Sequence, residues 1–316
     1  MTNLLSRARG VLWGQVTGDA LGTTVEFERS EIIAAKYPKG VREILGGGPF
    51  SMKAGQVTDD SELALCLARS LAEQRTYDED DVARRYIAWC QGNPPDCGGT
   101  TRRAFGASIP QGAPVAATVR ARALRDSQAN GALMRVSPLA VFGSRLDPEA
   151  LHALAAADAS LSHPHEVCVA ANQVFVFAIS YALRTGASGP EVFDATLAFA
   201  KGTLSCTEAL PTLELAAHAL PADAFTHMGW VRIALQCAFN QLRRATDFEQ
   251  AMADVVGLGG DTDTNACITG ALLGAVFGVE GIPLRWIQTV KACEPRRPRE
   301  FWCDDLDELA AALVQR

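Results

Sequence analysis

The sequence predicts an all-α fold, with residues 1–316 forming a single compact multi-helix domain that contains a metal cleft. Apolar residues recur at helical spacing along most of the chain, and β-branched alternation bounded by turns is nearly absent. Hydrophobic residues make up 48% and charged residues 21%, as in globular proteins with a sizeable core. No charge break, low-complexity linker or internal repeat divides the chain, so we expect one domain.

The first helix is expected over residues 3–22, with a glycine at every fourth position. Gly10, Gly14, Gly18 and Gly22 line one face, where another helix can approach closely. Asp19 lies on that face, so we expect it to be buried and to need a partner. A second helix is expected from after Asp60 to about residue 74. The others are expected at about residues 79–91, 167–183, 190–201, 206–217, 229–244, 247–257, 262–278, 282–292 and 304–315.

Two acidic clusters dominate the functional interpretation. Each combines carboxylates with hydroxyl side chains, follows a glycine and precedes an apolar helix: Thr58, Asp59 and Asp60 in the first, and Asp261, Asp263 and Thr264 in the second. Ordinary helix capping, or the positive end of the helix dipole, would explain either cluster alone. Uncompensated charge entering a core is costly, and oxygen ligands at this density favour Mg²⁺ or Mn²⁺. The two clusters together therefore predict one or two metal ions.

Other polar segments are candidates for ligand binding. Residues 93–103 form a Pro-Pro, Asp, Gly-Gly, Thr-Thr loop that leads into a helix and suits a phosphate or diphosphate, although its spacing is not that of a Walker loop. Residues 128–135 are a polar turn, and by themselves they favour a plain Asn-Gly turn. His163 and His165 favour a role at a helix start, or ring stacking on a ligand, over metal ligation. Glu26 is either a site acid or an exposed loop acid.

Composition narrows the class of protein. The formal net charge of −7 argues against a general nucleic-acid-binding surface. Neither a signal peptide nor a membrane span is expected, so we predict a cytoplasmic enzyme. The nine cysteines include no CxxC pair, which argues against a zinc site or a disulfide framework. Most should be small buried hydrophobes, and Cys97 is the exception because it lies in a polar loop.

Six motifs occur in an order that resembles one family. They are Gly-Asp-Ala-Leu-Gly at 18–22, Thr-Asp-Asp-Ser at 58–61, Asp-Cys-Gly followed by Thr-Thr at 96–101, Asn-Gly-Ala-Leu-Met-Arg at 130–135, Ser-His-Pro-His at 162–165 and Gly-Gly-Asp-Thr-Asp-Thr at 259–264. The chain resembles the ADP-ribosylglycohydrolases, the relatives of dinitrogenase reductase-activating glycohydrolase and ADP-ribosylarginine hydrolase. The resemblance spans about residues 5–280, and the basic run at 296–299 lies outside it.

The resemblance implies an all-α fold with two Mg²⁺ or Mn²⁺ ions at the bottom of a cleft. The metal ligands by match are Thr58, Asp59, Asp60, Asp261, Asp263 and Thr264. Glu26 matches a site acid that can move with its loop, and Asp96 matches an acid that contacts the ribose. The segments that hold the diphosphate and the ADP-ribose are matched by Gly98, Gly99, Asn130, Gly131 and His163. Cys97 stands where an aliphatic residue is common, and Ser162 where Thr is usual.

The implied activity is hydrolysis of the N-glycosidic bond between ADP-ribose and an arginine of an ADP-ribosylated protein. Vicinal ribose hydroxyls would bind the metals, and Asp60, Asp96 or Glu26 would be the general base on water. Alternatives are a serine- or O-acetyl-ADP-ribose-directed hydrolase, a metal-dependent phosphoesterase, and a non-catalytic relative that binds ADP-ribose or a toxin. The retained aspartates argue against the last. The forms of the motifs at 18–22 and 58–61 look closer to the arginine-directed branch.

Overall fold

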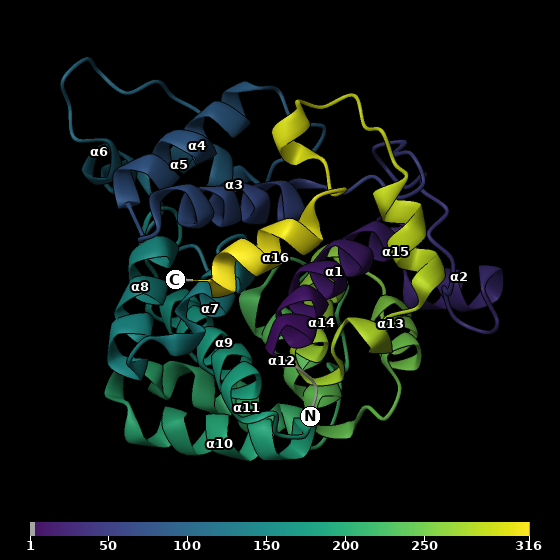
Figure 1. Cartoon of the computed structure of the whole chain (residues 1–316). Coiled ribbons are helices and arrows are strands. Elements are labelled where there is room, and N and C mark those ends of the chain that lie inside the picture. The colour runs from purple at the N-terminus through teal and green to yellow at the C-terminus, as the bar shows by residue number, and fades with distance from the viewer. Residues whose placement is uncertain (1–3, 316) are drawn as a thin grey trace.

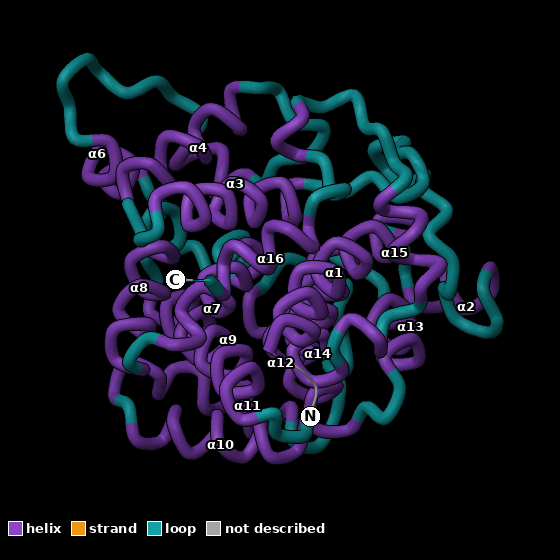
Figure 2. The backbone as a smooth tube through the Cα atoms, in the orientation of Figure 1, coloured by secondary structure: helices purple, strands orange, loops and turns teal. Residues whose placement is uncertain are grey.

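The fold is helical throughout the part of the chain that the computed structural model describes, residues 4–315 (Figure 2). These residues form sixteen α-helices and no β-strand, which confirms the all-α prediction. The α-helices are α1 (Leu4–Gly22), α2 (Ser30–Lys36), α3 (Asp59–Gln74), α4 (Glu79–Gln91), α5 (Gly99–Phe105), α6 (Val115–Arg122), α7 (Ser137–Phe142), α8 (Pro148–Ser160), α9 (Glu166–Thr185), α10 (Gly189–Gly202), α11 (Leu210–Ala216), α12 (Val231–Arg244), α13 (Phe248–Val256), α14 (Thr262–Phe277), α15 (Leu284–Lys291) and α16 (Leu306–Val314). Short 3₁₀ turns join them: η1 (Thr23–Val25), η2 (Leu133–Arg135), η3 (Gly143–Arg145), η4 (Leu204–Ala209), η5 (Val279–Gly281) and η6 (Arg299–Phe301).

The helices expected from periodicity are present, with ends shifted by a few residues. The segment expected at 206–217 is helical from Leu204 to Ala216, but it begins as the 3₁₀ helix η4 and becomes the α-helix α11 only at Leu210. Pro211 lies in the first turn of α11, where proline is tolerated because its missing N–H would have no partner there. Helices α2, α6 and α8 were not predicted from the sequence. For α8 a signal was present: Asp147 caps the helix and Pro148 opens it.

The close approach expected of the glycine face on α1 is confirmed, and its partner is α14. A methyl group on Gly10, Gly14, Gly18 or Gly22 would overlap a backbone carbonyl oxygen of α14. Gly270 and Gly274 of α14 touch the backbone of α1 in the same way. The two helices lie together in the middle of the molecule (Figure 1). This contact brings the end of α1 beside the start of α14, which carries the second acidic cluster.

Most of the core is one apolar cluster that runs from Ala8 to Leu313, so both ends of the described chain contribute to it, and a small second cluster contains Ala224, Ile233, Cys237 and Val255. Near the C-terminus, α16 packs on α1, α3 and α7. Among the described helices, α9 is long and apolar enough to cross a membrane by length and composition alone. However, 78% of its most apolar stretch is buried inside the fold, as expected of a core helix. The chain thus forms one compact helical body.

Candidate active site

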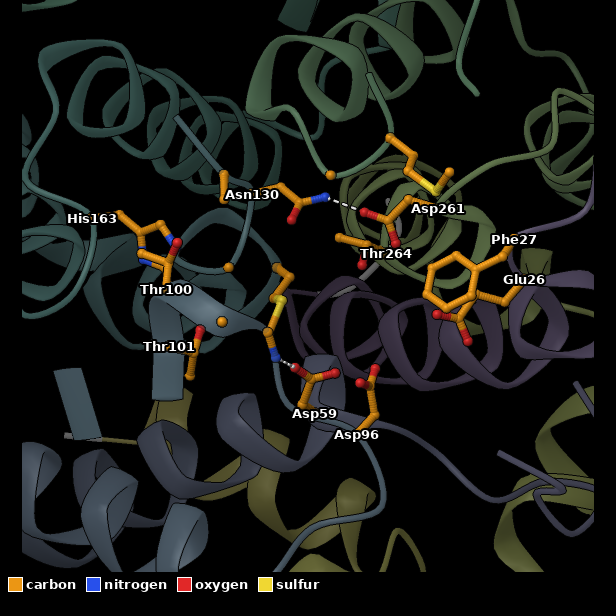
Figure 3. Close-up of a pocket in the computed structure, with 17 residues that line it drawn as sticks. Glu26, Phe27, Asp59, Asp96, Thr100, Thr101, Asn130, His163, Asp261 and Thr264 are labelled. Atoms are coloured by element: carbon orange, nitrogen blue, oxygen red, sulfur yellow. Dashed lines mark hydrogen bonds between the residues drawn. The ribbon is translucent and has the colours of Figure 1, made fainter. Parts of the chain in front are cut away.

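A pocket of about 230 Å³ gathers most of the residues that the sequence singles out (Figure 3). Ten of the thirteen predicted site residues line it: Glu26, Asp59, Asp96, Gly98, Gly99, Asn130, Gly131, His163, Asp261 and Thr264. Thr58, Asp60 and Asp263 do not line it, but they lie buried next to residues that do. Among residues 4–315, which the structure describes, no lysine or arginine side chain lines the pocket. Segments far apart in sequence therefore meet at one site.

The pocket has two halves of different chemistry. Four carboxylates line the acidic half, those of Glu26, Asp59, Asp96 and Asp261, and two more, those of Asp60 and Asp263, are buried directly beside them. The neutral half contains glycines and uncharged polar side chains: Gly98, Gly99, Asn130, Gly131 and His163. In Figure 3, Asp59, Asp96 and Glu26 lie on one side, and His163 lies on the other.

The loop after α1 carries Glu26 into the acidic half. Phe27 N donates to the Gly260 carbonyl oxygen at 2.8 Å, and Gly260 N donates to the Glu28 carbonyl oxygen at 2.9 Å. Gly259 and Gly260 both have φ near +75°, and a methyl group on either would meet neighbouring backbone, so this pairing requires glycine at both positions. Glu26 is only 4% exposed. The alternative of an exposed loop acid is therefore wrong.

The first acidic cluster is held from behind by Asp19, the buried residue expected to need a partner. Asp19 accepts hydrogen bonds from the backbone N–H and hydroxyl of Thr58, at 3.1 Å each, and from Ser61 Oγ at 2.5 Å. Burial raises the pKa of Asp19 to about 6, although these hydrogen bonds oppose the shift. Asp19 thus fixes the start of α3 and turns Asp59 and Asp60 toward the second cluster.

The acidic residues at the helix starts do not act as ordinary caps. Thr58 precedes α3 and Asp261 precedes α14, yet neither side chain makes a capping hydrogen bond. Elsewhere in the chain, Asp78 caps α4 and Asp247 caps α13 in the usual way, by accepting a backbone N–H three residues on. Capping therefore does not explain why carboxylates gather here.

Several carboxylate oxygens of the acidic half are buried without a hydrogen-bond partner. Asp60 Oδ2 lies 3.0 Å from Thr58 Oγ1, whose one hydrogen it shares with Asp19, and accepts from Thr264 Oγ1 at 3.4 Å, whereas Asp60 Oδ1 has no partner among the described residues. Glu26 Oε2 is also without one. Single oxygens of Glu26, Asp261 and Asp263 all lie within 4.8 Å of one another. Buried oxygens at this density, with no basic side chain among them, fit a hard divalent cation.

The raised pKa values of the carboxyl groups in the acidic half also favour a bound divalent cation. Burial, followed by the negative charges of Asp96 and Asp261, raises the pKa of Glu26 to about 9. Burial also raises the pKa of Asp59, Asp60 and Asp263 well above the usual range, and neighbouring carboxylates add to each shift. The chain alone therefore stabilises these groups as protonated acids. A divalent cation would stabilise them as carboxylates.

Asp96 and Asp59 connect the acidic half to the loop before α5. Gly98 N donates to Asp59 Oδ2 at 3.3 Å, and Cys97 N donates to Asp96 Oδ1 at 2.7 Å. The Asp59 and Asp96 carboxyls lie side by side in Figure 3. Asp96 is half-buried and faces the pocket.

A second buried interaction supports α3 from the C-terminal segment, where the sequence showed no usable motif. Arg297 Nε and Nη2 both donate to the Glu62 carboxylate at 2.8 Å, and Trp89 Nε1 donates to Glu62 Oε2 at 2.7 Å. Arg297 Nη1 also donates to the Gly92 carbonyl oxygen at 3.0 Å. Arg297 thus ties α3 to the start of the loop that carries Asp96.

Asn130 and Gly131 join the two halves. Asn130 N donates to the Gly229 carbonyl oxygen at 2.9 Å, and Asn130 Nδ2 donates to Asp261 Oδ2 at 2.6 Å. A methyl group on Gly131 would come within 3.0 Å of the His163 ring, so glycine lets that ring pack against the backbone. Asn130 is 7% exposed and contacts a predicted metal ligand. A plain surface turn, which the residues alone favoured, is therefore the wrong interpretation.

His163 presents a buried ring nitrogen to the pocket. Arg135 Nη1 donates to Ser162 Oγ at 2.9 Å, and the Ser162 hydroxyl pairs with His163 Nδ1 at 2.8 Å. We assign the ring proton to Nε2, so that Ser162 donates to Nδ1, and the buried Nε2 has no partner among the described residues. Burial, together with the charge of Arg135, lowers the pKa of His163 to about 3, so the ring is neutral. It is a neutral hydrogen-bond donor.

Other lining residues were not predicted individually. Thr100 and Thr101 belong to a quoted motif, whereas Phe27, Met228 and Gly229 carried no signal. Phe27 has φ of +63°, which is rare for a bulky residue, and its ring is 46% exposed. Met228 and Gly229 precede α12, and the pairing of residues 229–231 with residues 128–130 holds them at the site. Contacts between two loops leave no local pattern in a sequence.

Comparison with known proteins agrees with this geometry. The family described as ADP-ribosylglycohydrolase matches residues 1–316. The ADP-ribosyl-(dinitrogen reductase) glycohydrolase of Rhodospirillum rubrum is 30% identical over 89% of this chain and 89% of its own. The ADP-ribosylarginine hydrolase Tri1 of Pseudomonas putida is 28% identical over 99% of this chain and 79% of its own. A solved "ADP-ribosylglycohydrolase-related protein complex" superimposes with a TM-score of 0.81 at 30% identity, over 99% of each chain. The chain therefore belongs to the ADP-ribosylglycohydrolase family, whose members hydrolyse ADP-ribosyl linkages.

Proposed function

We propose that this protein removes ADP-ribose from arginine residues of ADP-ribosylated proteins and requires Mg²⁺ or Mn²⁺ to do so. The observation that carries the proposal is the acidic half itself: four carboxylates line it and two more are buried beside it, whereas no lysine or arginine side chain of residues 4–315 lines the pocket. The name of one relative, an ADP-ribosylarginine hydrolase, supports the arginine linkage, and the name of another, which acts on ADP-ribosylated dinitrogen reductase, supports a protein substrate. We place the enzyme in the cytoplasm.

The proposed metal ligands are the carboxylates and hydroxyls of the two clusters: Thr58, Asp59, Asp60, Asp261, Asp263 and Thr264. Their oxygen-only chemistry suits two Mg²⁺ or Mn²⁺ ions. Glu26 belongs with them, because its carboxylate is within reach of Asp261 and Asp263. Bound there, the metal would neutralise the carboxylates and act as a Lewis acid toward the ribose hydroxyls. The chain's own residues hold this set in place, through Asp19 behind α3 and Asn130 beside Asp261.

Asp96 is our candidate for the general base. Of the three acids considered, Asp60 does not line the pocket and Glu26 sits among the metal ligands, whereas Asp96 faces the open space. Burial raises its pKa above the usual range of a carboxylic acid, which moves it toward the pH at which a base works best. The Cys97 N–H holds one oxygen of this carboxyl, and a hydrogen bond with the Asp59 side chain holds the group beside the proposed metal ligands.

The neutral half is proposed to hold the diphosphate and the remainder of the ADP-ribose. His163 Nε2 offers a neutral donor, and Gly98 and Gly99 expose backbone without side chains. A methyl group on Gly99 would meet nothing within 4 Å, so a ligand can come close to the backbone there. Uncharged donors hold an anionic ligand without competing with the metal for the carboxylates.

The test is release of free ADP-ribose from arginine-ADP-ribosylated protein, measured with Mg²⁺, with Mn²⁺ and after chelation. We expect release that depends on metal and that Asp261→Asn abolishes. Lys36→Ala, at a half-exposed ion pair with Glu28, is the control and should keep full activity. Release only from serine-linked or O-acetyl-ADP-ribose would overturn the arginine assignment. Tight binding of ADP-ribose without release from any linkage would indicate a binding protein.

A further inference from the structure

We propose that Cys90 and Cys97 are a redox pair: oxidation by a peroxide joins them in a disulfide that shifts the loop carrying Asp96 and lowers the activity of the pocket. The effect on activity rests on the proposed function, whereas formation of the disulfide does not. The two halves of the proposal are therefore tested by separate measurements.

The two sulfur atoms are already in contact. Cys90 Sγ and Cys97 Sγ lie 4.0 Å apart, and the described residues contain no other pair of cysteine sulfurs in contact. Cys90 is in the last turn of α4, and Cys97 directly precedes Gly98, the N-cap residue before α5. A bond of about 2.05 Å requires the sulfurs to approach by about 2 Å, which is a local movement of a loop.

The loop between the two cysteines can make this movement at one of its ends. Gly92 is held by Arg297, which is itself locked to Glu62. At the other end, Cys97 is half-buried and Gly98 is exposed. A forming disulfide would therefore draw Cys97 toward α4. Cys90 is buried, so a small oxidant would reach its sulfur past the half-buried Cys97 that touches it.

The chemistry favours reaction at this pair. A hydrogen bond from Cys97 lowers the pKa of Cys90 to about 7, although burial opposes the shift. The Cys90 thiolate attacks hydrogen peroxide, breaks its O–O bond and becomes a sulfenic acid, with release of hydroxide. The Cys97 thiol then attacks that sulfur, forms the S–S bond and expels water. The two thiols supply two protons and two electrons, and one peroxide becomes two molecules of water.

The end of the loop that moves is hydrogen-bonded to two carboxylates of the acidic half. The backbone N–H of Cys97 donates to Asp96 Oδ1, and the backbone N–H of Gly98 donates to Asp59 Oδ2. Displacing Cys97 therefore displaces the proposed base and a donor to a proposed metal ligand together. A misplacement of about 1 Å at a reacting group can cost roughly a hundredfold in rate, so we expect oxidation to lower activity roughly ten- to a hundredfold.

The experiment treats reduced protein with hydrogen peroxide, blocks the remaining thiols, and follows both intact mass and ADP-ribose release. Cys97→Val removes the sulfur and restores the aliphatic residue common in the family. Cys293→Ser is the matched control, because Cys293 is also half-buried but touches no other cysteine sulfur. Wild type and Cys293→Ser should form a disulfide that peptide mapping places at 90–97, lose activity and regain it with dithiothreitol. Cys97→Val should form no such bond and keep its activity in peroxide.

Three results would overturn the proposal. The first is an oxidised wild type without a bond between Cys90 and Cys97. The second is the bond with unchanged ADP-ribose release, which would refute the regulatory half. The third is an equal loss of activity in Cys97→Val. If the reduced protein releases no ADP-ribose from any linkage, the proposed function fails instead. In that case the mass measurement still decides disulfide formation, and calorimetry of ADP-ribose binding, reduced against oxidised, decides the effect on the pocket.

Discussion

The two halves of the pocket are held by buried charges in opposite ways. Behind the neutral half, Arg135 and Asp158 are both fully buried and paired at 3.1 Å, and Arg135 also donates to the Gly131 carbonyl oxygen and to Ser162 Oγ. Behind the acidic half, Asp19 is equally buried but has only hydroxyl and N–H partners, and no cation. Behind the neutral half, two side chains of the protein neutralise each other's buried charge. In the acidic half, neutralisation of the carboxylates requires a bound cation.

The largest effect is expected when a charge is removed from the acidic half, which tests whether its carboxylates bind a metal. Asp60→Asn keeps the shape of the side chain but removes one carboxylate from the proposed metal site. We expect ADP-ribose release to fall roughly a thousandfold, since a catalytic metal contributes several kcal/mol to lowering the barrier. The initial rate at saturating Mg²⁺ measures the effect.

The same variant should not be less stable than the wild type in the absence of metal. Burial raises the pKa of Asp60, so the charged form is a cost that the amide avoids. Urea unfolding in chelator measures this. A variant that is inactive because it is unfolded would contradict the assignment of Asp60 to the metal site.

Removing a charge from behind the neutral half should have the opposite effect on stability. Arg135→Leu leaves Asp158 buried and unpaired, and breaking a buried pair in this way costs about 3–5 kcal/mol in the free energy of unfolding. Asp158 keeps the Tyr86 hydroxyl as a partner, at 3.0 Å. Urea unfolding of the metal-free protein is the measurement.

The control for Arg135→Leu is Lys36→Ala at the half-exposed pair with Glu28, for which a loss of at most about 1 kcal/mol is expected. Equal losses in the two variants would show that the buried pair has no special structural role.

The pH dependence of stability, measured without and with metal, tests the raised pKa values of the acidic half. The folded-state pKa values of Asp19, about 6, and Glu26, about 9, are raised, so the metal-free folded protein binds protons that the unfolded chain has released. Their contribution to stability is therefore present at low pH and is lost as the pH rises through these values. We expect the melting temperature in chelator to fall between about pH 5 and pH 8, and Mg²⁺ to restore more of it at the higher pH.

Glu26→Gln separates this effect from other titrating groups. The variant should show a shallower fall of melting temperature with pH in chelator, because one raised pKa has been removed. The prediction would be refuted by wild-type and variant curves that run parallel.

The smallest expected effect is at His163. His163→Phe keeps an aromatic ring against Gly131 and removes the free Nε2 donor. The affinity for ADP-ribose should fall by about 1 kcal/mol, or roughly fivefold, as for one neutral hydrogen bond. Isothermal titration calorimetry measures it. Stabilisation by Mg²⁺ should be unchanged, and a loss of it would mean that the two halves are not independent.

Local patterns in the sequence predicted most of the fold and the gathering of the site. Helical periodicity located the long helices, because each has a face that must be buried. The glycine spacing on α1 predicted a close helix contact, although it did not identify α14. Paired carboxylates at two helix starts indicated a shared cation, since such charge is too costly to bury alone. Short helices such as α2 and α6 were missed, because seven or eight residues carry too little periodicity.

The sequence by itself determined the helices, the glycine face and the identity of the carboxylates. Only the tertiary structure decided that Glu26 is buried among the carboxylates, that Gly229 reaches the pocket through Asn130, and that the Cys90 and Cys97 sulfurs touch. The physical reason is the range of the interactions. Whether a helix face is buried and whether a turn needs glycine depend mainly on residues that are close in sequence, so a local pattern reveals them. A contact between two loops depends on where distant helices place them, and α1 packed against α14 fixes that position.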